Sequence, residues 1–270
     1  MTVDLAVLVL PAFDDLAGLP GETAPWTDAY DFTAEVDLPG LATPLRYTDD
    51  GLGIVPTGVG KANAATTATA LLASDRIDLA DAVILSVGVA GAPPTVPVGS
   101  VLVTDQIVDW DDKCRFDDGL ASNPYTEGQG QYDLDPDLVE RIESLGKSVD
   151  LDSPTDGAPE PRLLTGTNLC GDELWHGAEL AEQAAWLVDQ YDAAPYRVTE
   201  MEDAGTAAAL ERFDRLDSYC AIRGVSNYDR PTGTQSARES FFDDEFEDGF
   251  GIAVENAVAV ARSVVDDRLG

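Results

Sequence analysis

The longest uncharged run of the chain, Ala82 to Val103, limits what the protein can fold into. By length alone it would suffice for a membrane-spanning helix. Its middle is interrupted by glycines and prolines, at Gly88, Gly91, Pro93, Pro94, Pro97 and Gly99. Such residues end regular structure, so the run divides into two β-branched segments joined by a turn. We therefore expect strand, loop and strand here and no membrane-embedded segment.

The rest of the chain alternates between β-branched runs and helical patterns. We expect strands at 4–10, 45–47, 53–57, 82–87, 101–108, 162–167, 196–200 and 219–225. We expect helices at 61–73, 136–145, 178–190, 205–213 and 250–268, and long loops at 111–132 and 150–160. This alternation predicts a three-layer α/β/α sandwich with a central mixed sheet, built as a single domain over residues 1–270.

The charge balance excludes one class of partner. The chain has 51 Asp and Glu residues against 16 Lys and Arg residues, a formal net charge of −35, yet 44% of its residues are hydrophobic. At molar salt the Debye length falls to roughly 3 Å, so the self-repulsion of such a surface is screened. The composition therefore indicates a halophile's cytoplasm. Nucleic acid is excluded as a partner, because its binding requires a basic surface.

Cysteine usage and the N-terminal sequence agree with a cytoplasmic location. Cys114, Cys170 and Cys220 are widely spaced and form no CxxC pair, so we expect free thiols in a reducing compartment and no metal site. The apolar run from Leu5 to Phe13 lacks a basic segment before it and is followed by acidic residues. It therefore predicts a first buried strand rather than a signal peptide.

Three strand ends carry polar or glycine-rich motifs. The first is Gly58-Val59-Gly60-Lys61 at the start of a predicted helix, where backbone N–H groups favour anionic or polar oxygen. The second is the acidic segment 200–203, Glu-Met-Glu-Asp, which fits either a diol-binding carboxylate or helix capping with solvated acid. The third contains Arg223 within an apolar strand. A buried arginine requires a carboxylate partner, for which Glu200 and Glu202 are the candidates.

The order of these motifs resembles the nucleoside phosphorylase superfamily. GVGKANAA at 58–65, GVAG at 88–91, EMED at 200–203 and IRGVSN at 222–227 are similar to the methylthioadenosine nucleosidases. The segment 166–177, GTNLCGDELWHG, is similar to the purine nucleoside permeases of that superfamily. The resemblance implies a protein that binds purine nucleosides and cleaves their N-glycosidic bond.

Site residues follow from the resemblance position by position. Glu202 matches the glutamate that binds the ribose 2′- and 3′-hydroxyls, Met201 the methionine beside the sugar, and Gly88 with Val89 the turn next to the anomeric carbon. Asn227 matches the residue that contacts purine N7; an amide can hydrogen-bond the leaving base but cannot supply a proton. Asp229 is the alternative proton donor.

The base-binding side is implied with less detail. Asn168, Trp175 and His176 lie in the segment where the superfamily forms its base-binding wall. His176 fits either a packed residue or a substrate contact. Phe241 matches an aromatic residue on the base or 5′ side, with a core position as the alternative.

The co-substrate, phosphate or water, is left open. Where phosphorylases of the superfamily hold phosphate with arginine and serine, this chain has Ser86 and Val89, and it has no arginine before Arg46. A phosphate dianion bound without a cation is poorly stabilised, which favours hydrolysis. Gly60 and Lys61 remain as candidates for the phosphate or water side. For hydrolysis we expect Asp14 or Asp15 to activate water, unless both are solvated acids of a loop.

Two classes of function therefore remain, a nucleoside-cleaving enzyme and a non-catalytic nucleoside-binding protein that assists uptake. In both, the partner is a purine nucleoside and no cofactor is expected beyond inorganic phosphate as a possible co-substrate. We also expect the chain to form a homo-oligomer without membrane insertion.

Overall fold

A mixed β-sheet forms the centre of the protein. The computed structural model describes residues 2–14, 18, 21–126, 129–155, 157–241 and 245–270, without the side chains of 245–248. In these residues the main sheet consists of β2 (Val7–Leu10), β3 (Ala34–Val36), β4 (Leu45–Tyr47), β5 (Leu52–Ile54), β7 (Val83–Ala92), β8 (Val101–Asp109), β11 (Gln131–Asp133), β12 (Leu163–Cys170), β13 (Tyr196–Glu200) and β14 (Tyr219–Tyr228). Two short pairs stand beside it, β1 (Val3–Asp4) with β6 (Ile77–Asp78) and β9 (Lys113–Phe116) with β10 (Gly119–Ser122).

Five strands of this sheet close into a ring. The pairing runs from β8 through β12 and β13 to β7, and β14 pairs with both β7 and β8. β12 is parallel to β8 and β13, whereas β13 is antiparallel to β7 and β14 is antiparallel to β8. A closed ring removes exposed strand edges and brings the ends of strands that are distant in sequence to one place.

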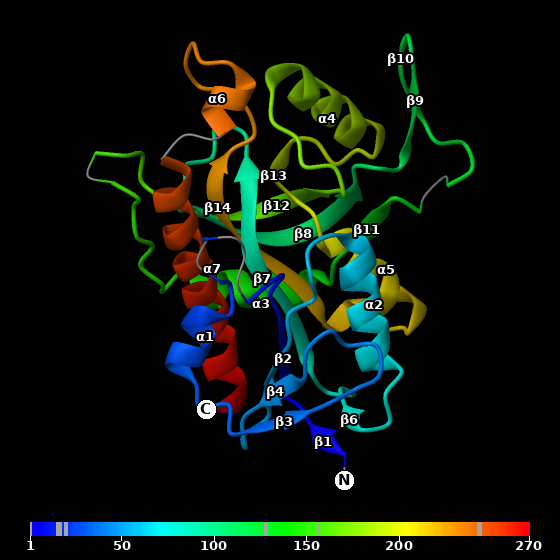
Figure 1. Cartoon of the computed structure of the whole chain (residues 1–270), viewed down its shortest axis with the longest axis vertical. Coiled ribbons are helices and arrows are strands. Elements are labelled where there is room, and N and C mark those ends of the chain that lie inside the picture. Colours follow the sequence, from blue (N-terminus) through cyan, green and yellow to red (C-terminus); the bar gives the residue numbers. More distant parts are fainter. Residues whose placement is uncertain (1, 15–17, 19–20, 127–128, 156, 242–244) are drawn as a thin grey trace.

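Helices cover the sheet on two sides. They are α1 (Ala24–Ala29), α2 (Lys61–Leu72), α3 (Pro136–Gly146), α4 (Ala178–Gln190), α5 (Asp203–Arg212), α6 (Ala237–Phe241) and α7 (Glu245–Leu269), with a 3₁₀ turn at Leu216–Ser218. α7 packs against β14 and β7, and α2 packs against α5. Figure 1 shows α1 and α7 on one side of the central strands and α2 with α5 on the other. The predicted three-layer architecture is confirmed.

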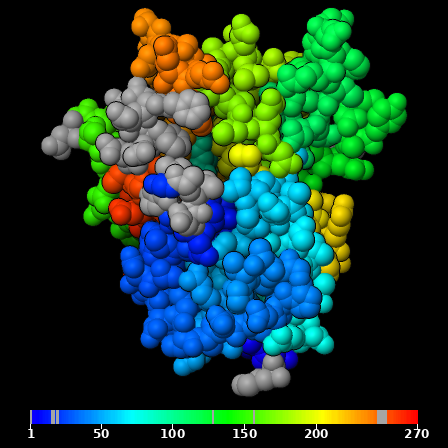
Figure 2. All heavy atoms as spheres, viewed as in Figure 1, coloured from blue at the N-terminus to red at the C-terminus, as the bar shows by residue number. Residues whose placement is uncertain are grey.

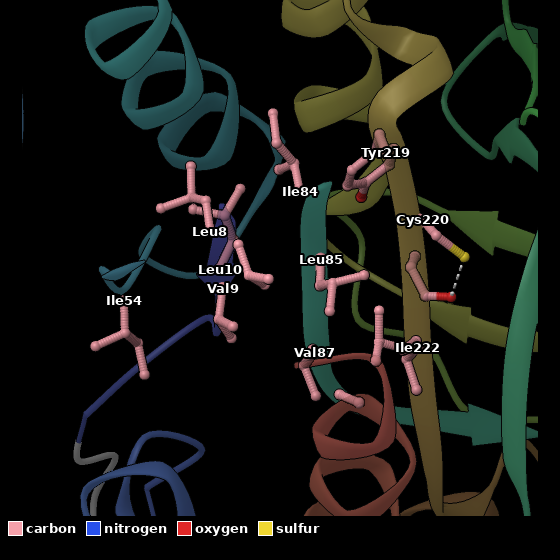
Figure 3. Close-up of a cluster of buried hydrophobic side chains, with 14 of the residues drawn as sticks. Leu8, Val9, Leu10, Ile54, Ile84, Leu85, Val87, Tyr219, Cys220 and Ile222 are labelled. Atoms are coloured by element: carbon pink, nitrogen blue, oxygen red, sulfur yellow. Dashed lines mark hydrogen bonds between the residues drawn. The ribbon is translucent and has the colours of Figure 1, made fainter. Parts of the chain in front are cut away.

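The apolar core lies where the central strands meet the helices. Val7, Val9, Leu85 and Ile222 are fully buried, as the mainly apolar sequences of β2, β7 and β14 predict for strands covered on both faces. Figure 3 shows the side chains of these three strands gathered together. Burial of a large aliphatic side chain contributes about 1.5–3 kcal/mol, so this cluster holds the strand ends that carry the site in place.

All predicted strands and helices occur, several with shifted bounds, but α1, β3, β6 and α6 were not predicted. The predicted long loop at 111–132 instead contains the β9–β10 hairpin and β11. Polar and apolar residues alternate from Lys113 to Phe116, and a turn precedes Gly119, so the two segments pair as a hairpin. The polar composition of the region had favoured a loop. No element occurs between 150 and 160 in the described residues, as predicted. None of the described helices combines the length and the apolar character needed to cross a membrane.

Candidate active site

Three strand ends meet at one place, because their pairing fixes their positions. In the parallel pair β7 and β14, Arg223 lies opposite Gly88 and Asn227 lies opposite Gly91. β13 reaches the same point from the other side, with Thr199 opposite Gly91. The Gly88–Gly91 segment lies within strand β7 and not in the predicted turn. It is a neighbour of the acidic segment and of the RGVSN segment, although the three are far apart in sequence.

A buried cluster of carboxylates surrounds Arg223 next to the Gly88–Gly91 segment. The Arg223 guanidinium is 1% exposed, and its Nη2 lies 3.0 Å from Glu200 Oε2. Its Nη1 lies 3.6 Å from Glu202 Oε2, which confirms the predicted carboxylate partners. The structure adds a third partner, because Arg223 Nε donates to Asp203 Oδ2 at 2.9 Å. Arg223 thus orients the acidic segment from beneath.

Glu202 connects this cluster to the start of α2. Its Oε1 accepts a hydrogen bond from the Gly60 backbone N–H at 3.0 Å, and the residue is 6% exposed. Burial raises the pKa of Glu202, while Arg223 and the Gly60 N–H oppose the increase. Glu200 also has a raised pKa because of burial, with the negative charge of Asp203 adding to it. The sequence-predicted Met201 lies between these two glutamates and is half-buried.

Sequence reasoning missed Glu22, which lies against the Gly88–Gly91 segment of β7. Its Oε1 accepts a hydrogen bond from Val89 N at 2.9 Å, and its Oε2 accepts one from Ala12 N at 2.6 Å. A Cβ atom at Gly88 would lie 2.5 Å from Glu22 Oε1 and 2.8 Å from Arg223 Nη1, so only glycine permits this approach. Burial raises the pKa of the Glu22 carboxyl, and the Arg223 charge partly offsets the effect.

Asp14, the sequence-predicted water-activating residue, is engaged elsewhere. Its Oδ1 lies 3.1 Å from Arg46 Nη2 and accepts a hydrogen bond from Thr23 Oγ1, and its side chain is 48% exposed. The structure thus places Glu22, not Asp14, beside Gly88 and Val89. Asp15, the other candidate, lies outside the described residues.

The start of α2 is occupied by acidic side chains. The Lys61 backbone N–H donates to Asp172 Oδ1 at 2.8 Å. The neighbouring Gly60 N–H donates to Glu202. The Lys61 ammonium lies 2.6 Å from Asp109 Oδ1 and 2.7 Å from Asp111 Oδ2. Burial by itself would lower the pKa of Lys61, but these two carboxylates raise it overall. Two N–H groups of this helix terminus and the Lys61 ammonium are therefore already paired with carboxylates.

A cavity of about 270 Å³ opens on the other side of Asn227. Its lining includes three sequence-predicted residues, Asn227, His176 and Phe241. The rings of His176 and Phe241 meet edge to face with centroids 5.6 Å apart. His176 Nε2 lies 3.3 Å from Ser240 Oγ, and burial lowers the pKa of the imidazole. The residues of α6 and those just before α4 adjoin each other at the upper end of the face in Figure 2.

The amide of Asn227 is held in one orientation. Its Oδ1 accepts a hydrogen bond from Ser226 Oγ at 2.8 Å, and its Nδ2 donates to the Tyr228 carbonyl at 2.8 Å. One amide hydrogen and one oxygen lone pair remain for another partner. Asn227 adjoins Gly91 of β7 and also lines the cavity, a position from which it can contact a ligand that enters both.

Three other predicted residues do not line this cavity. Asn168 is fully buried and donates to Asp203 Oδ2 at 2.8 Å, so it supports the carboxylate cluster. Trp175 packs against Trp110 with ring centroids 5.8 Å apart, in a separate apolar cluster. Asp229 is buried and accepts a hydrogen bond from the Tyr196 hydroxyl at 2.6 Å.

The described residues contain no group of three or more His, Cys, Asp or Glu side chains arranged to bind a metal ion. Their chemistry consists of carboxylates with raised pKa values on one side of Asn227 and a cavity with aromatic and polar lining on the other. Such a site can hold a neutral, polyhydroxylated ligand and transfer protons at its centre.

This mixed α/β fold, with its glycine-containing strand β7 and buried acidic cluster, defines the class to which the chain belongs. The family model described as "Phosphorylase superfamily" matches residues 45–266, and the chain is a member of that superfamily.

Individual relatives are more distant. A protein named purine nucleoside permease from Candida albicans is 24% identical over 292 aligned positions, covering 91% of this chain and 72% of the relative. Among solved structures, the 5′-methylthioadenosine/S-adenosylhomocysteine nucleosidase of Neisseria meningitidis is 16% identical with a TM-score of 0.71, covering 98% of this chain and 99% of that one. The futalosine hydrolase of Helicobacter pylori is 17% identical with a TM-score of 0.69, covering 97% and 98%. These structural likenesses show a shared fold.

Proposed function

We propose that the protein binds purine ribonucleosides and hydrolyses their N-glycosidic bond, releasing the base and free ribose. The observation that carries the proposal is the position of Glu22, whose buried carboxylate lies against Gly88 and Val89. The family and the nucleosidases among its structural neighbours support the same chemistry.

Glu202 is proposed to bind the ribose. A carboxylate can accept hydrogen bonds from both hydroxyls of a vicinal diol, and Glu202 is fixed by Gly60 N–H and by Arg223. Its Oε2, which faces the guanidinium at 3.6 Å, retains lone pairs for these hydroxyls. Met201 beside it supplies an apolar contact for the sugar face.

Glu22 is proposed to activate the water. Each of its oxygens accepts one backbone N–H, which leaves lone pairs on both to accept a proton. As the water oxygen bonds to C1′, the C1′–N9 bond breaks, its electron pair passes to the base and the water proton passes to Glu22. A raised pKa makes this carboxylate a stronger base than an exposed one.

Asn227 is proposed to stabilise the leaving base. Its remaining oxygen lone pair can accept the N7–H of the base as charge moves into the ring, and its remaining N–H can donate to a 6-substituent. The proton itself must come from solvent or from another group, because an amide cannot supply it. Asp229 is not placed for this role, since Tyr196 and Arg230 occupy its carboxylate.

Occupation of the α2 terminus supports water rather than phosphate as co-substrate. Two backbone N–H groups that would bind an anion already donate to Glu202 and Asp172. Lys61 is paired with Asp109 and Asp111. A phosphate dianion would have to displace these carboxylates or lie beside them, and both are unfavourable.

The second candidate function is nucleoside binding without chemistry, which the name of the Candida albicans relative favours. One experiment separates the alternatives. The purified protein is incubated in high salt with inosine, guanosine and adenosine, with and without inorganic phosphate, and base, ribose and ribose 1-phosphate are quantified. We expect base and ribose without phosphate. Strict phosphate dependence with ribose 1-phosphate as product contradicts hydrolysis, and binding without any base release supports the second candidate.

A further inference from the structure

The described lining of the cavity beside Asn227 differs in charge from the chain as a whole. The chain contains 51 acidic residues, yet no Asp or Glu is among the described residues that line this cavity. Of the same residues, Arg230 alone carries a permanent positive charge. Among the described residues, the lining thus offers a guanidinium donor and no carboxylate acceptor.

Arg230 is held in place from behind. Its Nε donates to Asp229 Oδ1 at 2.6 Å, and its Nη2 donates to Asp229 Oδ2 at 3.0 Å and to the Tyr196 hydroxyl at 2.8 Å. Asp229 is itself fixed, because its backbone N–H donates to the Ala92 carbonyl and its own carbonyl accepts from Gly177 N–H. A guanidinium fixed by a two-point carboxylate contact loses little further freedom when it binds a ligand.

One edge of the guanidinium remains available. Within the described part of the chain, Arg230 Nη1 has no hydrogen-bond partner, and the side chain is 27% exposed where it borders the cavity. Asp229 neutralises the charge of Arg230, so the pair presents N–H donors with no net charge. Such a group favours a neutral acceptor such as a carbonyl oxygen and gains less from an anion.

We propose that Arg230 selects nucleosides whose base carries a carbonyl at position 6, so that the preferred substrates are 6-oxopurine ribonucleosides. The guanidinium donates to the O6 atom, whereas the amino group of a 6-aminopurine would place N–H against N–H. A donor that the bound base shields from water and leaves without an acceptor is costly, which makes such sites selective. The inference rests on the proposed function, because it assumes that the base enters this cavity.

The test measures binding of free bases as well as cleavage, so it does not depend on turnover. Dissociation constants for hypoxanthine, adenine and unsubstituted purine are measured by calorimetry, and kcat/KM is measured for inosine, adenosine and purine riboside. We expect the wild-type protein to favour the 6-oxo compound over both others by about 10- to 100-fold, the range for a hydrogen bond to a charged group.

Variants assign the preference to Arg230. Arg230→Gln should lower affinity and kcat/KM for the 6-oxo compounds about 10- to 100-fold and change those for purine and purine riboside less than about threefold. Arg230→Lys, which keeps a donor and the contact with Asp229, should retain part of the preference. Arg238→Gln on α6 is the matched control, because Arg238 is exposed and does not line the cavity. It should leave every value unchanged.

The outcomes distinguish the inference from the proposed function. Equal affinity of the wild-type protein for hypoxanthine, adenine and purine overturns the inference, as does an equal loss for all three in Arg230→Gln. Absence of nucleoside cleavage together with an Arg230-dependent preference for hypoxanthine overturns the proposed function and supports the inference. If Arg230→Gln does not fold, the comparison is made on Arg230→Lys, where an unreduced preference for hypoxanthine over purine overturns the inference.

Discussion

Replacement of Glu22 by glutamine tests the proposed chemistry at one atom pair. Glutamine keeps the length of the side chain, and its carbonyl oxygen can still accept one of the two backbone N–H groups, from Ala12 or Val89. Its NH₂ group then faces the other N–H, which costs about 1–3 kcal/mol for the lost hydrogen bond. Relief of the burial penalty, which the raised pKa of Glu22 reveals, offsets part of this cost. The fold should therefore persist.

The kinetic effect should be much larger. Loss of a general base lowers kcat by about 10²- to 10⁴-fold, equivalent to about 2.7–5.5 kcal/mol of transition-state stabilisation. Nucleoside affinity should change little, because Glu202 and the cavity residues are proposed to bind sugar and base. The measurement combines single-turnover release of hypoxanthine from inosine with calorimetric affinity, and thermal unfolding verifies the fold.

Asp14→Asn is the matched control for this variant. It also removes one carboxylate from the same loop, but that carboxylate pairs with Arg46 and is 48% exposed. We expect kcat within about threefold of the wild-type value, as for a surface ion pair. A larger loss in Asp14→Asn than in Glu22→Gln would refute the assignment of Glu22 and restore the expectation derived from sequence.

Four further results are expected. Glu202→Gln should weaken binding of a ribonucleoside by about 1–3 kcal/mol and that of its 2′-deoxy counterpart much less, and calorimetry showing equal losses would remove the ribose role. Gly88→Ala should destabilise the protein by about 1–3 kcal/mol in denaturant unfolding, whereas Gly91→Ala, whose new Cβ meets only atoms at 3.5 Å or beyond, should cost much less. The acidic limb of the kcat/KM profile should lie above pH 4.5, because Glu22 must be ionised and its pKa is raised; a limb at or below 4.5 contradicts this. The raised pKa of Glu200, about 8 against an ordinary 4.5, contributes stability that is lost as pH rises between these values. The melting temperature at constant salt should therefore fall between about pH 4.5 and 8, and Glu200→Gln should reduce that fall.

The sequence predicted the strands and helices that carry the site better than the side chains that form it. Strand ends could be located from apolar runs bounded by glycine and polar residues, and β4, β13 and α4 have the predicted bounds. Burial of Arg223 also followed from its apolar neighbours, because an unpaired buried guanidinium is too costly. These inferences depend on local composition, which a single sequence contains.

Glu22 could not be found in this way, because its position depends on how a loop closes. The Glu22 N–H donates to the Phe13 carbonyl at 3.2 Å, so the chain returns to the end of β2 after nine residues of sequence separation. Gly21 makes the return possible, since a Cβ there would overlap the Asp14 carbonyl. Asp14 follows the strand closely in sequence, so the sequence favoured it as the water-activating residue. In the structure, the carboxylate of Glu22 lies at this strand end instead.

Asn168 shows a second limit of sequence reasoning. Successive side chains of a strand point to opposite faces, and the motif alone does not say which face is the ligand side. In β12, Asn168 faces the carboxylate cluster, where its amide donates to Glu200 Oε1 and Asp203 Oδ2. It therefore stabilises the carboxylates next to Glu202, and it does not line the cavity.

The charge of the site itself argues for a neutral co-substrate. Glu22, Glu200, Glu202 and Asp203 set four carboxylates around one guanidinium, that of Arg223, all in low-dielectric surroundings. Raised pKa values for the three glutamates mean that the cluster holds protons more tightly than exposed carboxylates do. Adding a phosphate dianion to this excess of negative charge would require either further protonation of the carboxylates or additional cations. Lys61 and Arg46 are already paired with other carboxylates. A water molecule and an uncharged nucleoside add no charge, and the same carboxylates can accept their hydrogen bonds.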